Sequence, residues 1–142
     1  MCSSSRRNVL IGLGAAALPA SLALAASAAS EQAGLFVTEA ERLRKEAMAA
    51  GDQPFGAVVV RGGQIVGYGP SRVVVDRNLD AHAERVAIWD AQKRLGTKDL
   101  AGATMYSTSR PCSDCETAAA LANLDRMYYG PSATDAGKPR RR

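Results

Sequence analysis

Apolar side chains recur at helical spacing in the segment that follows the first thirty residues. The positions are Leu35, Phe36, Ala40, Leu43, Ala47 and Met48. A period of three to four residues predicts an amphipathic helix. Thr38 and Glu41 have the spacing of a capping box, and Gly51 is a helix-stop signal. We therefore predict a first helix that begins at about Ala33 or Thr38 and ends at Ala50.

Strand and helix patterns alternate along the rest of the chain. The stretch FGAVVVRGGQIVGYG, residues 55–69, has two apolar runs around a Gly-Gly pair, which predicts two strands joined by a tight turn. After a polar loop, the later elements are a helix over 81–96, a strand over 102–109, a helix over 113–124 and a strand over 125–130. Strands separated by helices predict an α/β fold with a mixed sheet and helices on its faces.

Composition and charge fit a single globular domain. The 142 residues suit one modest core, and 46% hydrophobic with 23% charged residues is ordinary usage. Removing Arg6 and Arg7 from the 18 basic residues leaves 16 against 14 acidic ones, a charge of +2 that gives no support for nucleic-acid binding. Residues 131–142 show no periodicity, so we predict a tail there, with a solvated basic end at 137–142.

The N-terminus has the order of regions found in an export signal. Arg6 and Arg7 precede an uncharged apolar run from Val9 to about Ala25, and small residues in the A-x-A pattern follow. The run SRRNVLI resembles a twin-arginine signal. The alternative is a membrane anchor, but the run is weakly hydrophobic and short for a span of about 20 residues. We expect residues 1–30 to engage the twin-arginine export machinery and the protein to be periplasmic or extracellular, without a stable membrane span.

Three potential metal ligands stand at the starts of two predicted helices. His82 is the single histidine of the chain, and Cys112 and Cys115 are three residues apart. A catalytic zinc ion commonly takes three such ligands and keeps a fourth position for water. Free N–H groups at a helix start favour the thiolate form that metal binding needs. Glu84 can converge on the same point if the metal lies end-on to its helix, where a free carboxylate can carry protons.

The segments HAE, residues 82–84, and PCSDC, residues 111–115, together carry the H-x-E and P-C-x-x-C signature of the zinc-dependent cytidine and nucleobase deaminases. PFGAVVVRGGQIVGYG also resembles the first hairpin of the guanine deaminase and transfer-RNA adenosine deaminase branch. This resemblance implies a three-layer α/β/α cytidine-deaminase-like fold with a zinc cofactor and a deaminase domain over 31–136. Relatives continue after ATDAG into another strand and one or two helices, so it also implies a C-terminally shortened fold.

The resemblance implies a role for each site residue. His82, Cys112 and Cys115 would bind zinc, and zinc hydroxide would attack the amidine carbon of a heterocycle. Glu84 would pass protons to the ring nitrogen and to the departing ammonia, and the backbone N–H of Ala83 would contact the substrate. We expect a hydrolase that deaminates a small nucleobase or nucleoside, with a purine such as guanine favoured. Family members commonly dimerise or tetramerise, so a homo-oligomer is expected.

Three candidate substrate contacts depart from the family pattern or have a second explanation. Ser71 stands where purine-acting relatives typically have an Asn that contacts the base or ribose, and a hydroxyl offers fewer hydrogen bonds than an amide. Arg110 stands where relatives often have Glu. It is either a surface or fold-stabilising charge, or a contact to an anionic or carbonyl-bearing substrate. Phe55 either lines the substrate pocket or packs in the core.

Two other hypotheses about the site stay open. A C-x-x-C pair alone is often a redox motif, although the upstream HAE segment and the position after the third strand favour zinc. The site is otherwise a non-catalytic zinc-stabilised binding module in which Glu84 has no chemical role. Both zinc hypotheses predict bound metal, so ammonia release that depends on Glu84 is the observation that separates them.

Overall fold

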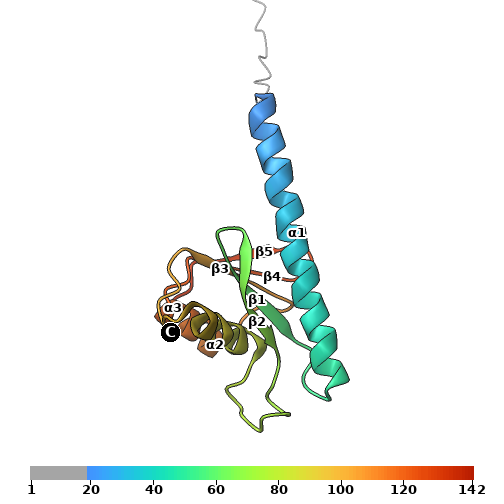
Figure 1. Ribbon diagram of the computed structural model, residues 1–142, viewed down its shortest axis with the longest axis vertical. Coiled ribbons are helices and arrows are strands. Elements are labelled where there is room, and N and C mark those ends of the chain that lie inside the picture. The colour runs from blue at the N-terminus through green and yellow to red at the C-terminus, as the bar shows by residue number, and fades with distance from the viewer. Residues whose placement is uncertain (1–18) are drawn as a thin grey trace, which may run out of the picture.

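The computed structural model describes residues 19–142 as a five-stranded mixed sheet between helices on both faces (Figure 1). The predicted three-layer α/β fold is confirmed. The elements in chain order are α1 (Ala20–Ala49), β1 (Gly56–Arg61), β2 (Gln64–Pro70), α2 (Ala83–Leu95), β3 (Ala103–Ser107), α3 (Ser113–Leu121), β4 (Arg126–Tyr129) and β5 (Thr134–Gly137). Helix α1 lies on one side of the sheet, and α2 and α3 lie on the other.

The sheet has the strand order β2-β1-β3-β4-β5. Strands β1 and β2 form the predicted antiparallel hairpin, and Gly62 and Gly63 in its turn have φ angles of 60° and 74°, which favour glycine. Strand β1 also pairs antiparallel with β3, β3 runs parallel to β4, and β4 pairs antiparallel with β5. The parallel pair is joined through α3, so the chain returns over one face of the sheet between them.

Strand β1 is buried on both faces and contributes to two cores. Ala57 and Val59 pack with α2 and α3, whereas Val58 and Val60 pack against α1. Because side chains alternate across a strand, each pair faces one helical layer. This explains the continuous apolar run AVVV, which is typical of a strand covered on both sides.

Glycines set the close approach of helix α2 to the hairpin. A Cβ atom at Gly67 or Gly69 would overlap the backbone carbonyls of Ala87 or Ala83 on α2. Because glycine has only a hydrogen atom in place of a side chain, α2 can lie directly on β2 at these two positions. This contact holds the start of α2 against the end of the hairpin.

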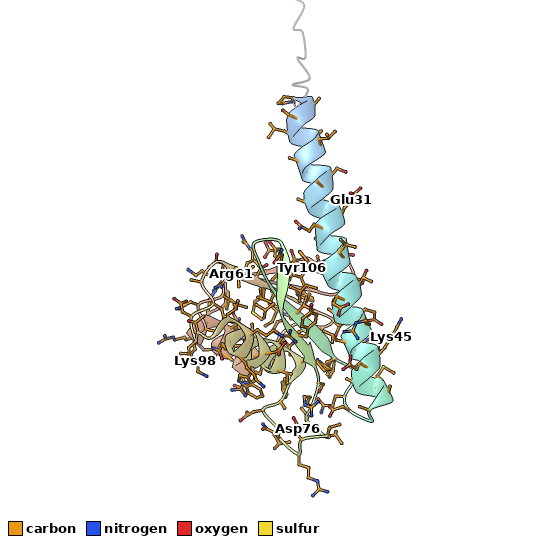
Figure 2. The ribbon with its side chains drawn as sticks, in the orientation of Figure 1. Glu31, Lys45, Arg61, Asp76, Lys98 and Tyr106 are labelled. Carbon is orange, nitrogen blue, oxygen red and sulfur yellow. The ribbon has the colours of Figure 1, made fainter. Side chains whose placement is uncertain are left out.

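Helix α1 begins earlier than predicted. It starts at Ala20, and the Thr38 hydroxyl donates to the Gly34 carbonyl inside the helix, so the predicted capping box is wrong. The alanine-rich stretch before residue 33 has a high helix propensity and needs no buried face to continue the helix. This part of α1 projects past the sheet, with Glu31 on it (Figure 2). The predicted signal lies partly in residues 1–18, which are outside the described residues.

None of the helices in residues 19–142 combines the length and apolar character of a membrane span.

The predicted tail is wrong over Thr134–Gly137, whereas four of the five residues in the basic end 138–142 are exposed and belong to no helix or strand. Residues Thr134–Gly137 form β5 at the sheet edge, Pro139 is buried, and the Arg142 guanidinium lies 2.8 Å from a Glu116 carboxylate oxygen. The side chains of β5 are mostly exposed, so its pairing comes from backbone hydrogen bonds and leaves no hydrophobic alternation in the sequence. Helix α3 also ends at Leu121, three residues before the predicted limit.

Candidate metal and catalytic site

Helix α2 presents His82 and Glu84 at its first turn. His82 is the N-cap residue, with an extended ψ of 151°, and its carbonyl accepts the first helical hydrogen bond from Val86 at 2.9 Å. The helix ends at Gly96, whose left-handed φ of 65° terminates it, as predicted. Because Glu84 lies in the first turn, both side chains can face the space in front of the helix end.

Helix α3 presents the two cysteines in the same way. Cys112 is the N-cap residue, and its sulfur accepts a hydrogen bond from the Cys115 backbone N–H at 3.4 Å. The loop before it is held to the sheet, since the Thr108 backbone N–H donates to the Gly56 carbonyl at 2.9 Å. The Gly56 N–H donates in return to the Thr108 hydroxyl at 3.1 Å. The cysteines therefore stand on a segment fixed to β1.

The three predicted ligand atoms converge. His82 Nδ1 lies 3.6 Å from Cys112 Sγ and 3.4 Å from Cys115 Sγ, and the three atoms all lie within 4.8 Å of one another. Zinc–sulfur bonds of about 2.3 Å and zinc–nitrogen bonds of about 2.0–2.1 Å at tetrahedral angles place nitrogen and sulfur roughly 3.5 Å apart. Both thiols are free. The donor set and its spacing thus fit a tetrahedral zinc ion with three protein ligands.

Burial governs the charges at this site. Burial raises the pKa of the Glu84 carboxyl, which is 5% exposed, above its usual range. Burial, followed by the Glu84 charge, also raises the pKa of the Cys115 thiol. A Cys115 thiolate therefore needs a cation beside it, which a bound zinc ion supplies. The Glu84 carboxylate lies 3.7 Å from Cys115 Sγ but does not belong to the converging group, so it stands next to the metal position as a free carboxylate.

The candidate substrate contacts do not gather in one cavity. Phe55 lines a groove of about 590 Å³ between α1 and the loop after β3, whereas Arg110 lines a separate pocket of about 230 Å³ beside α3. Ala83, the first residue of α2, has its side chain buried in the core. Ser71 is buried as well, and its hydroxyl donates to Asp52 at 2.8 Å. The structure thus brings the metal ligands and Glu84 together, and distributes the other four residues around them.

Asp52 was not among the sequence candidates. Its buried carboxylate accepts hydrogen bonds from Ser71 Oγ and from three backbone N–H groups, those of Gln53, Val74 and Val75. It thereby ties the end of α1 to the loop between β2 and α2, whose far end carries Asp76 (Figure 2). In sequence, Asp52 follows a glycine in a turn, where an acidic residue is common, so only the fold distinguishes it.

Comparison with known proteins identifies the arrangement. The family model of the cytidine and deoxycytidylate deaminase zinc-binding region matches residues 30–131, more than half of the chain. The chain belongs to this family. The matched range holds the converging histidine and cysteines and also the free carboxylate. A His/Cys/Cys group in a zinc-binding family makes zinc the cofactor of this site.

Relatives within the family act on different substrates. The chain is 36% identical over 96 residues to the tRNA-specific adenosine deaminase of Bacillus subtilis, covering 68% of this chain and 60% of the relative. It is also 36% identical over 104 residues to the guanine deaminase of the same organism, covering 72% and 67%. The X-ray structure of a Bacillus subtilis guanine deaminase superposes with a TM-score of 0.65 at 35% identity, covering 68% and 62%. The chain thus spans about three fifths of the first of these relatives.

Proposed function

We propose that this protein is a zinc-dependent hydrolase that deaminates a small amino-bearing heterocycle, a free nucleobase or nucleoside. The observation that carries the proposal is one imidazole nitrogen and two sulfurs at zinc spacing, with an unligated buried carboxylate beside them. Water replaces the exocyclic amine at the amidine carbon, a C–O bond forms, the C–N bond breaks and ammonia leaves. Both named relatives in Bacillus subtilis are deaminases, which supports this reaction class.

Each residue has a defined task in this reaction. His82, Cys112 and Cys115 hold the zinc ion, which when bound lowers the pKa of water towards about 7. Glu84 accepts a proton from the attacking water and delivers it to the substrate, so that the amine departs as ammonia. Its burial keeps bulk water from competing for that proton. Ala83 is the first residue of α2, and its backbone N–H has no partner within the helix, which leaves it free for a substrate oxygen or ring nitrogen.

A purine base such as guanine is the favoured substrate. The similarity to guanine deaminase over 72% of this chain supports this preference. The Ser71 hydroxyl already donates to Asp52, so we expect the substrate to be recognised without a hydrogen bond from Ser71. The net charge of +2 outside the first thirty residues gives no general attraction for a polynucleotide, so a transfer-RNA substrate is less favoured than a free base.

The test is ammonia release from zinc-loaded protein across guanine, adenine, cytosine, their nucleosides and related pterin-like compounds. Glu84→Gln should retain zinc and the melting temperature but lose about 10²–10⁴-fold in turnover, the usual contribution of a general acid–base group. Glu46→Gln, an exposed change on α1, is the matched control and should leave turnover unchanged. If the wild-type chain binds zinc and releases no ammonia from any compound, the site is the non-catalytic binding module.

We further propose that residues 1–30 act as a twin-arginine export signal. The run SRRNVLI supports this, as does the position of the buried residues of α1, which begin only at Phe36. A reporter fused behind the full chain should accumulate outside the cytoplasm. Arg6→Lys together with Arg7→Lys should retain the reporter inside, and export of this variant at the wild-type level would contradict the proposal.

A further inference from the structure

The C-terminal segment encloses a second pocket, separate from the metal position. It has a volume of about 230 Å³ and lies between the start of α3 and the edge formed by β4 and β5. Its wall includes Arg110, Pro111, Ser113, Glu116, Arg140 and Arg142. Two of them, Pro111 and Ser113, are the chain neighbours of the metal-ligand candidate Cys112. The C-terminus itself lies beside α3 (Figure 1).

Specific contacts hold the wall of this pocket. Pro139 is buried after β5, and the backbone N–H of Arg142 donates to the Thr117 hydroxyl at 3.2 Å. The Arg142 guanidinium also donates to the Glu116 carboxylate at 2.8 Å. The burial of Pro139 and the two bonds of Arg142 therefore hold this exposed basic segment beside α3.

The pocket carries an excess of positive charge. Glu116 balances Arg142, but Arg110 and Arg140 form no ion pair with a carboxylate in residues 19–142. The Arg110 guanidinium instead lies 5.9 Å from the centre of the Tyr129 ring, and this neutral neighbour does not cancel its charge. Two arginines without an ion pair, Arg110 and Arg140, therefore line one small pocket together with Ser113.

We propose that this pocket binds a phosphate group. Guanidinium groups donate paired N–H bonds that match phosphate oxygens, and two of them balance the charge of about −1.5 to −2 that a phosphate monoester carries at neutral pH. The Ser113 hydroxyl adds a third donor. The proposal does not depend on deamination, since binding of phosphate can be measured without any turnover. The phosphate is either a free anion or part of a nucleotide, and the pocket's lining residues Pro111 and Ser113 are next to Cys112 in the chain.

The primary experiment measures binding of inorganic phosphate to the zinc-loaded full chain by calorimetry, in chloride buffers of low and physiological ionic strength. Wild-type protein should bind, and affinity should fall at the higher ionic strength. Arg110→Gln with Arg140→Gln should weaken binding by at least about tenfold for each guanidinium removed. The matched control is Lys138→Gln with Arg141→Gln, which removes the same charge from side chains outside the pocket and should change affinity less than about twofold.

Each result decides the matter. Equal losses of phosphate affinity in the two double variants would mean that general positive charge attracts the anion, which overturns the proposal. The absence of binding to the wild-type protein at millimolar phosphate also overturns it. Both double variants change exposed residues, and equal melting temperatures confirm that they fold. The source of the phosphate is resolved by kinetics: a lower KM for a nucleoside monophosphate than for its nucleoside, lost in Arg110→Gln with Arg140→Gln, identifies a nucleotide. Unchanged KM values with intact phosphate binding identify a free-anion site.

Discussion

Replacing Asp52 by Asn should destabilise the fold through a loss of matched acceptors. One carboxylate oxygen accepts from the Gln53 N–H at 2.7 Å and from Ser71 Oγ at 2.8 Å, and the other accepts from the N–H groups of Val74 and Val75 at 2.9 and 2.8 Å. An asparagine side chain has the same shape but only one acceptor oxygen. In one orientation its NH₂ group would face the N–H groups of Val74 and Val75. In the other orientation it would face the Gln53 N–H and the Ser71 hydroxyl.

The magnitude follows from two donors that lose their acceptor. Each buried donor left without a partner costs about 1–3 kcal/mol. The hydrogen bonds from Val74 and Val75 are only partly buried, so the low end applies. We expect a loss of about 2–3 kcal/mol in the free energy of unfolding, which lowers the melting temperature by roughly 8–12 °C in a domain of this size.

The effect of pH has a definite sign. Burial by itself raises the pKa of Asp52, but the hydrogen bonds from Val75, Gln53, Ser71 and Val74 together outweigh it and lower the pKa below its usual range. A lowered folded-state pKa stabilises the protein above the unfolded pKa of about 3.9, and this contribution is lost as pH falls through the folded value. The stability difference between wild type and Asp52→Asn should therefore be constant near neutral pH and shrink in acid.

Thermal and urea unfolding followed by circular dichroism at pH 7 and at about pH 3 measures both effects. Asp76→Asn is the matched control, because Asp76 is exposed and pairs with Arg72 alone, and it should cost less than about 1 kcal/mol. A loss of stability at pH 7 that is no larger for Asp52→Asn than for Asp76→Asn would refute the assignment of Asp52 as the anchor of this loop.

Three further predictions concern the packing of the helices, the metal ligands and the deletion of the N-terminal segment. Gly67→Ala should lower the free energy of unfolding in urea by at least about 2 kcal/mol, because the new Cβ meets the α2 backbone. Gly34→Ala, with open space around it, should instead stabilise α1 by about 0.5–1 kcal/mol. Equal effects of the two changes would contradict the packing of α2 on Gly67. Chelation of zinc should make Cys112, which is exposed, reactive towards a thiol reagent, and reaction at the same rate in the zinc-loaded protein would exclude it as a ligand. Deleting residues 1–30 should change the melting temperature by less than about 3 °C, since α1 buries no residue before that limit; a larger fall would place part of the fold in the deleted segment.

Hydrophobic periodicity was sufficient to predict the hairpin, both site helices and the mixed sheet. The same pattern could not predict β5, because a short edge strand with exposed side chains pairs through its backbone and leaves no alternation. The start of α1 was missed for a related reason: its first turns have no buried face, so helix propensity alone extends it to Ala20.

The candidate metal site was predictable because its chemistry rests on rare residue types. One histidine and a C-x-x-C pair at helix starts leave few alternative partners in the chain. The surrounding residues were less predictable. Ser71 turns towards Asp52, and Arg110 faces a pocket that the C-terminal segment completes, so both depend on contacts between parts of the chain that are distant in sequence.

X-ray absorption at the zinc edge, recorded for the zinc-loaded wild type and for Glu84→Gln, distinguishes the three metal ligands from the free carboxylate. We expect two sulfurs at about 2.3 Å, one imidazole nitrogen at about 2.0–2.1 Å and one further light atom. We also expect the two spectra to be the same, because Glu84 carries protons and does not bind the metal. A spectrum with fewer than two sulfurs, or loss of the light-atom ligand in Glu84→Gln, would contradict this assignment of ligands.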